Sequence, residues 1–208
     1  MPTRADCLVI VFARAPRAGA VKTRLAGRIG EAAASRLHQR LVRAALRTAA
    51  ACGRAELHAT RGHRWFETLD VPVRLQRGAD LGERMFRALR AGLRRHRRVV
   101  LIGSDAPALS GGDLRRAARL LQAGADVVLV PAEDGGYALI GARRVVAGIF
   151  ESVAWGTRSV MTETRANLQR CGLRWRELRT VWDVDRPQDL ERLRSPRFAS
   201  AGRRAARR

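Results

Sequence analysis

The stretch that decides the fold is Cys7-Leu-Val-Ile-Val-Phe-Ala-Arg-Ala-Pro-Arg-Ala-Gly-Ala-Val-Lys-Thr-Arg-Leu25. Its first six residues are apolar without interruption, which is typical of a strand that is covered on both faces. A polar loop follows at once, and Lys22 in that loop is the only lysine of the chain. A buried first strand that leads into a cationic loop predicts an α/β fold with a candidate phosphate-binding site where the strand ends.

Apolar runs alternate with helical stretches along the rest of the chain. Further strands are expected at 55–60, 71–76, 99–103, 126–130 and 137–140, and helices at 31–52, 81–96, 159–171 and 187–193. One more helix begins at Ser110, where Asp113 three residues later completes a capping box. This alternation predicts a three-layer α/β/α sandwich on a mostly parallel, mixed sheet. Residues 1–194 are expected to form one domain, followed by a basic, disordered tail at 195–208.

The charge balance is strongly basic, with 41 Lys and Arg against 19 Asp and Glu and a net charge of +22. Such a surface attracts polyanions, which favours a nucleic-acid binder. The alternative is codon bias, because arginine replaces lysine throughout the chain rather than in one patch. Aromatic residues make up only 5%, so platforms for stacking bases are few. We therefore do not expect a nucleic-acid partner.

No apolar run is long enough to predict a membrane span. The three cysteines, Cys7, Cys52 and Cys171, are scattered and form no CxxC pair, which is typical of a reducing compartment. These features predict a cytoplasmic protein, and they make no prediction of its oligomeric state.

In open α/β sheets, ligands bind beyond the carboxyl ends of the strands, so the loops there are the candidates. The first loop matches neither the Walker A nor the GxGxxG pattern. It offers Gly19 for a tight backbone turn, and Lys22, Thr23 and Arg24 just before a helix. Cations and free N–H groups suit phosphates. We interpret these residues, with Arg14, as phosphate ligands rather than as a solvated basic loop, because a compact ammonium stands out here.

The second loop is Gly103-Ser-Asp-Ala-Pro107, at the end of the clearest strand. Asp105 offers a carboxylate there, and Mg²⁺ or Mn²⁺ that bridges phosphates needs one or two carboxylates plus waters. The alternative is an Asp that forms a turn before Pro107. We favour a metal ligand, because Ser110 and Asp113 already account for the helix start.

The third loop, Pro131-Ala-Glu-Asp-Gly-Gly-Tyr137, connects two expected strands. Asp-Gly-Gly is a strong hairpin signal, which is one interpretation of Asp134, Gly135 and Gly136. The other is functional: two glycines let a substrate approach the backbone, and Glu133 or Asp134 is a candidate metal ligand or base. Both interpretations remain open, with Tyr137 at the edge of the site.

Two further segments carry candidate residues. In Trp182-Asp-Val-Asp-Arg-Pro-Gln-Asp189, Asp185 is either a helix cap or a metal ligand, whereas Asp183 has no capping role and is a metal candidate. Trp155 in Trp155-Gly-Thr-Arg-Ser159 is either a stacking face of an acceptor lid or a core aromatic. The histidines show no metal-ligand spacing and are interpreted as ordinary surface or core residues: His38, His58, His63 and His96.

Together these motifs resemble the DUF2064 group of GT-A-fold transferases, also called selenodomain- or arsenosugar-associated glycosyltransferases. The resemblance runs from about Cys7 to Leu193 and rests on five stretches in order: Phe12-Ala-Arg-Ala-Pro…Gly19-Ala-Val-Lys-Thr-Arg-Leu25, Gly103-Ser-Asp-Ala-Pro107, Asp134-Gly-Gly-Tyr-Ala-Leu-Ile-Gly141, Trp155-Gly-Thr, and Asp183-Val-Asp-Arg-Pro-Gln-Asp-Leu190. It implies a nucleotide-diphospho-sugar transferase fold in which the Lys22 loop meets the phosphates and Asp105 meets the divalent ion. No second acid follows Asp105 in a DxD pattern, so Asp134, Asp183 or Asp185 is expected to complete the metal site.

The expected function is a Mg²⁺- or Mn²⁺-dependent transferase that moves a sugar from a nucleotide sugar to a small acceptor. Lys22 and Arg24 would hold the diphosphate, Asp105 the metal, and Asp134 would be the base for the acceptor hydroxyl. Two alternatives remain. One is a nucleotidyltransferase that joins an NTP to a phosphorylated metabolite and releases pyrophosphate. The other is a nucleotide- or polyanion-binding module without catalysis.

Overall fold

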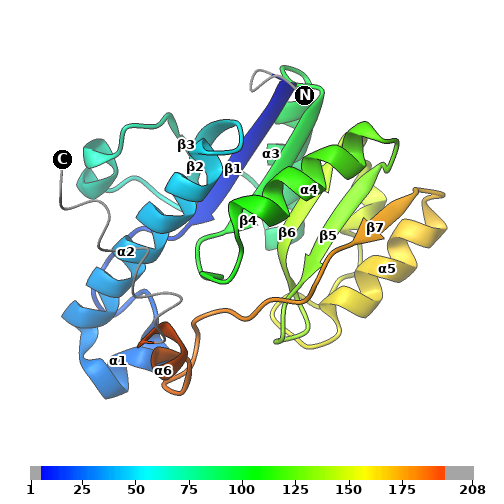
Figure 1. Cartoon of the computed structure of the whole chain (residues 1–208). Coiled ribbons are helices and arrows are strands. Elements are labelled where there is room, and N and C mark those ends of the chain that lie inside the picture. The colour runs from blue at the N-terminus through cyan, green and yellow to red at the C-terminus, as the bar shows by residue number, and fades with distance from the viewer. Residues whose placement is uncertain (1–5, 195–208) are drawn as a thin grey trace.

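The computed structural model describes residues 6–194, so the expected basic tail at 195–208 lies outside the described residues. Its centre is a seven-stranded sheet in the order β3-β2-β1-β4-β6-β5-β7 (Figure 1). The strands are β1 (Cys7–Ala13), β2 (Arg54–Ala59), β3 (Val73–Leu75), β4 (Arg98–Gly103), β5 (Val127–Pro131), β6 (Tyr137–Ala142) and β7 (Trp175–Glu177). Only β6 runs against its neighbours, β4 and β5. The prediction of a mostly parallel, mixed sheet is confirmed.

Helices cover both faces of the sheet, as expected for three layers (Figure 1). Helices α2 (Glu31–Ala50) and α4 (Gly111–Gln122) pack on one face through Val42, Leu46, Leu114 and Leu121. Helices α3 (Leu81–Leu93) and α5 (Val160–Arg170) pack on the other through Met85, Leu89, Met161 and Leu168. Strands between two helical layers must be apolar on both faces, and all seven residues of β1 are buried.

A third apolar cluster lies outside the two main layers, and it positions the C-terminal segment. Leu25 of α1 (Thr23–Ile29) and Leu41 of α2 pack there against Trp182 and Val184. Leu190 and Leu193 of α6 (Asp189–Arg194) pack against the same cluster. In Figure 1, α1 and α6 accordingly lie side by side at the lower end of the molecule. The cluster brings the Asp183–Asp185 stretch beside the loop that follows β1.

Several element boundaries differ from the sequence-based expectation. Strand β3 is shorter than expected, and α6 begins at Asp189 rather than Pro187. Helix α1, strand β7 and two 3₁₀ helices, Arg64–Thr68 and Ala147–Ile149, were not predicted. Strand β7 has only three residues, one aromatic and two charged, so it lacks the apolar run that marks the central strands. The Ser110–Asp113 capping box is confirmed.

The described part of the chain contains no helix that combines the length and apolarity needed to cross a membrane.

Close approach of α3 to the sheet requires a glycine at position 92. A Cβ there would lie 2.7 Å from Val99 Cγ2 and 3.1 Å from Leu8 Cδ2. We expect Gly92→Ala to lower the free energy of unfolding by about 1–3 kcal/mol, because the added methyl overpacks this contact. Urea unfolding followed by circular dichroism measures the change.

Gly27→Ala in α1 is the matched control, because nothing lies within 4 Å of a Cβ there. It should be neutral or stabilise by up to about 1 kcal/mol through reduced entropy of the unfolded chain. Equal effects of the two substitutions would contradict the packing account.

Candidate functional site

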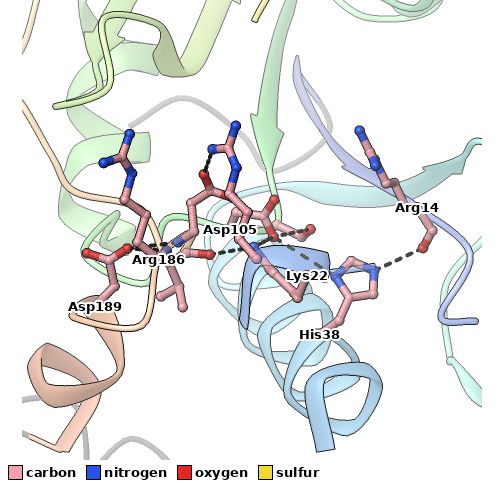
Figure 2. A network of polar contacts seen from close by, with 10 residues as sticks. Arg14, Lys22, His38, Asp105, Arg186 and Asp189 are labelled. Atoms are coloured by element: carbon pink, nitrogen blue, oxygen red, sulfur yellow. Dashed lines mark hydrogen bonds and ion pairs between the residues drawn. The ribbon is translucent and has the colours of Figure 1, made fainter. Parts of the chain in front are cut away.

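The Lys22 side chain lies at the carboxyl edge of the sheet, between three chain segments. It is 5% exposed, its ammonium lies 2.7 Å from Asp105 Oδ1, and it donates a hydrogen bond of 2.6 Å to the carbonyl of Val184. Asp105 follows β4, and Val184 belongs to the C-terminal segment. Figure 2 shows these contacts converging on the lysine. Lys22 and Asp105 therefore lie together, as predicted from the rule that ligand-binding loops follow the carboxyl ends of the strands at one edge of the sheet.

The backbone of Lys22 is in the left-handed region, with φ 52° and ψ 40°, at the N-cap of α1. A residue with a Cβ adopts this conformation at a cost of about 1 kcal/mol or more. Strain of this kind persists where surrounding contacts determine the conformation. Here the ion pair with Asp105 and the hydrogen bond to Val184 supply those contacts. The contacts of the Lys22 ammonium and the backbone conformation of Lys22 therefore depend on each other.

A second ion pair crosses the same site from the loop after β1 to the C-terminal segment. Arg24 pairs with Asp185, and the N–H of Val184 donates to the carbonyl of Asp105 at 2.8 Å. Asp185 is not a helix cap: Asp189 Oδ2 instead accepts from the N–H groups of Asp185 and Arg186, at 3.0 and 2.7 Å (Figure 2). Asp185 is thus left to interact with Arg24.

Acidic side chains crowd around Asp183. Burial, followed by the charges of Asp134, Asp185 and Asp105, raises the pKa of its carboxyl to about 6. A divalent cation would relieve this repulsion, so the donor chemistry fits one. Within residues 6–194, however, no three acids, histidines or cysteines already stand in a metal-ligating arrangement. Lys22 and Arg24 occupy positions beside Asp105 and Asp185, and they would have to move for a metal to enter.

His38 is a site residue that the sequence did not reveal. It lies on α2, is buried, and its Nε2 donates to the carbonyl of Arg14 at 3.0 Å (Figure 2). Its Nδ1 lies 4.0 Å from Asp105 Oδ1. Burial lowers the pKa of His38, which favours the neutral ring with the proton on Nε2. A lone histidine in a helix carries no motif, so only the fold brings it to this loop.

The remaining residues of the first loop have different surroundings. Arg14 and Thr23 are exposed, and Thr23 is the first residue of α1. Gly19 has a φ of +75°, which few other residues adopt and which agrees with the predicted tight turn. The backbone carbonyl of Arg14 accepts the hydrogen bond from His38. The exposed guanidinium of Arg14 takes no part in that bond and is available to a ligand.

The loop between β5 and β6 forms the turn that its sequence indicated. Asp134 Oδ1 accepts from the N–H of Gly136 at 2.9 Å, and Gly135 has a φ of +93°. A Cβ on Gly135 would lie 2.4 Å from the carbonyl oxygen of Arg158. Glycine is needed at 135 for close packing against the chain before α5, which is a structural reason independent of substrate. Glu133 pairs with Arg192.

Tyr137 and Trp155 pack together rather than among the charged groups of the site. Their rings meet edge to face at 6.4 Å, and Trp155 also contacts Phe150 at the same centroid distance. The Tyr137 hydroxyl lies 3.7 Å from Met85 Sδ. A Cβ on Gly82 would lie 2.6 Å from the Trp155 ring. Trp155 is half-buried, so its structural surroundings match the core-aromatic interpretation more closely than a free stacking face.

The site therefore combines two cations with an acidic cluster at one edge of the sheet. Lys22 and Arg24 come from the first loop, Asp105 from the second, and Asp183 and Asp185 from the C-terminal segment. Such an arrangement can hold a polyphosphate on its cations and a divalent ion on its carboxylates.

Comparison with known families identifies the chain. The model of DUF2064, described as an uncharacterized protein conserved in bacteria, matches residues 30–157, which is more than half of the chain. The chain belongs to the DUF2064 family. The resemblance inferred from the five sequence motifs is confirmed, and no curated protein matches the chain in sequence.

Solved structures share the fold. One is a protein of Desulfovibrio desulfuricans G20, provisionally named a nucleotide-diphospho-sugar transferase. It is 28% identical to this chain, with a TM-score of 0.83 over 94% of this chain and 93% of that one. A nucleotidyl transferase from Methanothermobacter thermautotroptrophicus is 17% identical, with a TM-score of 0.59 over 93% and 98%. A manganese complex of Rv0371C from Mycobacterium tuberculosis H37Rv is 20% identical, with a TM-score of 0.51 over 90% and 97%.

Replacing Asp183 tests the crowding of acids in this site. Because the native pKa of about 6 lies above the ordinary value, the folded state binds the proton more tightly than the unfolded state. Stability is therefore lost as pH rises from about 4 to 6 and stays lost above that range. Asp183→Asn removes this cost, so it should stabilise by about 1 kcal/mol more at about pH 8 than at about pH 4.5.

Urea unfolding at both pH values measures the difference. Asp70→Asn is the control, because Asp70 is exposed, and it should show no such pH dependence. An equal benefit of Asp183→Asn at both pH values would show that repulsion does not act on this carboxyl.

Proposed function

We propose that this chain is a metal-dependent transferase that uses a nucleotide-activated donor, and that it transfers a sugar from a nucleotide sugar to a small acceptor. One observation carries the proposal: Lys22, Asp105 and the Asp183–Asp185 segment converge at the carboxyl edge of a mostly parallel sheet. The fold shared with the Desulfovibrio protein supports it further. The cytoplasm remains its expected location.

The proposed roles follow from the charge of each group. Lys22 and Arg24 hold the diphosphate, with Arg14 and the N–H groups near Gly19 and Thr23 as further donors. Asp105, Asp183 and Asp185 hold Mg²⁺ or Mn²⁺, and the metal supplies neutralisation of the charge that develops on the leaving nucleotide.

Acceptor chemistry is assigned to the loop between β5 and β6. Asp134 takes the proton of the acceptor hydroxyl as that oxygen attacks the anomeric carbon. The bond between this carbon and the diphosphate oxygen breaks, and the nucleoside diphosphate leaves. The proposed acceptor side is formed by Gly135, Gly136, Tyr137 and Trp155. Gly135 and Trp155 are both held by close packing, so their proposed role is to fix the conformation of the acceptor side rather than to contact the acceptor through free groups.

Ligand binding at this site requires an exchange of partners. Lys22 pairs with Asp105, and Arg24 with Asp185, so each proposed phosphate ligand neutralises a proposed metal ligand. A metal on the carboxylates frees the cations for phosphate, and phosphate on the cations frees the carboxylates. Each ligand should therefore strengthen the binding of the other.

Mn²⁺ titrations followed by electron paramagnetic resonance test the exchange. In the wild type, a nucleoside diphosphate from a panel of four bases should tighten Mn²⁺ binding by about tenfold. Lys22→Met should bind Mn²⁺ more tightly than the wild type without nucleotide, because Asp105 is then unpaired. It should also lose most of the coupling to nucleotide.

Arg17→Met is the control for this titration, since Arg17 is an exposed cation of the same loop. It should keep both the Mn²⁺ affinity and the coupling of the wild type. If Lys22→Met binds Mn²⁺ as the wild type does, the carboxylate released by the substitution is not a metal ligand.

Nucleotidyl transfer is the second candidate function. A lysine in a loop after the first strand suits a triphosphate at least as well as a diphosphate sugar. The fold alone does not choose between the reactions, because a protein named a nucleotidyl transferase shares it. In this reaction the phosphate of a metabolite attacks the α-phosphorus of an NTP, and pyrophosphate leaves.

Product analysis separates the two reactions. The purified protein is incubated with Mn²⁺, a panel of nucleotide sugars or NTPs, and pooled small-molecule acceptors. Release of NDP from a nucleotide sugar supports glycosyl transfer, whereas release of pyrophosphate from an NTP supports the second candidate and contradicts the first. Asp105→Asn should lower the rate by about a hundredfold or more, because it removes a charge that the metal needs.

Asp70→Asn should leave the rate unchanged. If no panel member yields either product while nucleotide binding is intact, the binding-module alternative from the sequence is favoured. If Asp105→Asn turns over as the wild type does, the assignment of the metal site is wrong.

A further inference from the structure

A groove between the edge strand β3 and helix α3 lies outside the site described above. Its volume is about 470 Å³, within the range of small-molecule sites. Among residues 6–194, strand β3 pairs only with β2, so no other described strand lies along its outer edge. None of the groove's lining residues belongs to the Lys22–Asp105 site.

The groove is lined by four arginines and by no carboxylate. Two come from the strand side, Arg74 and Arg77, and two from α3, Arg84 and Arg87. Arg74 and Arg84 are anchored through Nε, to Glu56 and to the carbonyl of Gly78. Their Nη groups take no part in these two bonds.

The acids near the groove cancel only part of this charge. Glu56 is buried beneath it, and Arg95 binds both of its carboxylate oxygens, at 2.8 and 3.3 Å. Although burial opposes ionisation, hydrogen bonds from Arg95 and His58 hold the pKa of Glu56 at about 2. Glu83 pairs with Arg87 on the surface of α3. In the described part of the chain, the Arg77 guanidinium has no acidic partner.

The same groove also has an apolar wall. It lies on α3, where Ala88 and Ala91 line the groove. The side chains of Val73 and Leu75 lie on the other face of β3, because these residues pair with Leu57 and Ala59, which pack in the layer of α2 and α4. Small side chains on α3 leave room for a ligand body, and an apolar surface at this place favours one that is not purely ionic.

From these observations we propose that the groove binds a small phosphomonoester with a compact apolar group. Its phosphate dianion would lie among Arg74, Arg77, Arg84 and Arg87, because guanidinium groups donate paired hydrogen bonds to phosphate. Its apolar body would lie on Ala88 and Ala91 of α3. This inference is independent of the proposed transfer reaction.

Phenyl phosphate is the probe, compared with inorganic phosphate and phenol by titration calorimetry with EDTA present. Phenyl phosphate should bind about tenfold more tightly than inorganic phosphate, and phenol should not bind, since both the charge and the apolar body contribute. The double variant Arg77→Gln/Arg87→Gln should weaken phenyl phosphate binding by about tenfold or more. Ala91→Trp should abolish it by filling the groove without a change of charge.

Arg36→Gln/Arg40→Gln and Ala32→Trp are the matched controls, because these residues are exposed on α2. Both should bind phenyl phosphate as the wild type does, and the groove variants should retain Mn²⁺-dependent nucleotide binding. Equal affinity for phenyl and inorganic phosphate would overturn the proposal, as would equal losses in the groove and control variants. Either result would reduce the groove to a part of the general positive surface.

Discussion

The contact between Lys22 and Asp105 is the interaction on which the rest of the site depends. An ammonium that is 5% exposed needs a partner, because a buried charge without one is strongly destabilising. Asp105 provides the opposite charge and Val184 a carbonyl. In this way one side chain joins the loops after β1 and β4 to the C-terminal segment. It also holds its own backbone in a conformation that is unfavourable for a residue with a Cβ.

The apolar core supplies the framework for this contact. Buried β1 and β4 run parallel and in register, so their loops emerge at the same edge. Trp182 and Val184 are held by Leu25 and Leu41, which brings Asp183 and Asp185 to that edge as well. The acids then repel one another, as the raised pKa of Asp183 indicates. A chain with a net charge of +22 has thus gathered scarce carboxylates at one place, which is a feature of binding sites rather than of stable surfaces.

The sequence predicted the parts of this arrangement that depend on local pattern. Uninterrupted apolar runs identified β1 and β4, and the strand-end rule then placed Lys22 and Asp105 at one edge. The sequence could not predict the ion pair between Lys22 and Asp105, or that between Arg24 and Asp185, because each contact joins segments more than eighty residues apart. His38 was missed because a lone histidine carries no motif, and only the packing of α2 brings it to Arg14. Strand β7 was missed because pairing with β5, rather than its own composition, makes it a strand.

Because Lys22 is the only lysine, the central contact can be observed alone. Protein labelled with ¹⁵N-lysine gives one side-chain ammonium signal in a nuclear magnetic resonance spectrum. Without ligands, that signal should be protected from rapid exchange with water and should move in Asp105→Asn. Mn²⁺ is replaced by diamagnetic Mg²⁺, and addition of Mg²⁺ with the nucleotide that binds should shift the signal as the ammonium passes from carboxylate to phosphate. A signal that exchanges rapidly and responds neither to the substitution nor to the ligands would contradict the account.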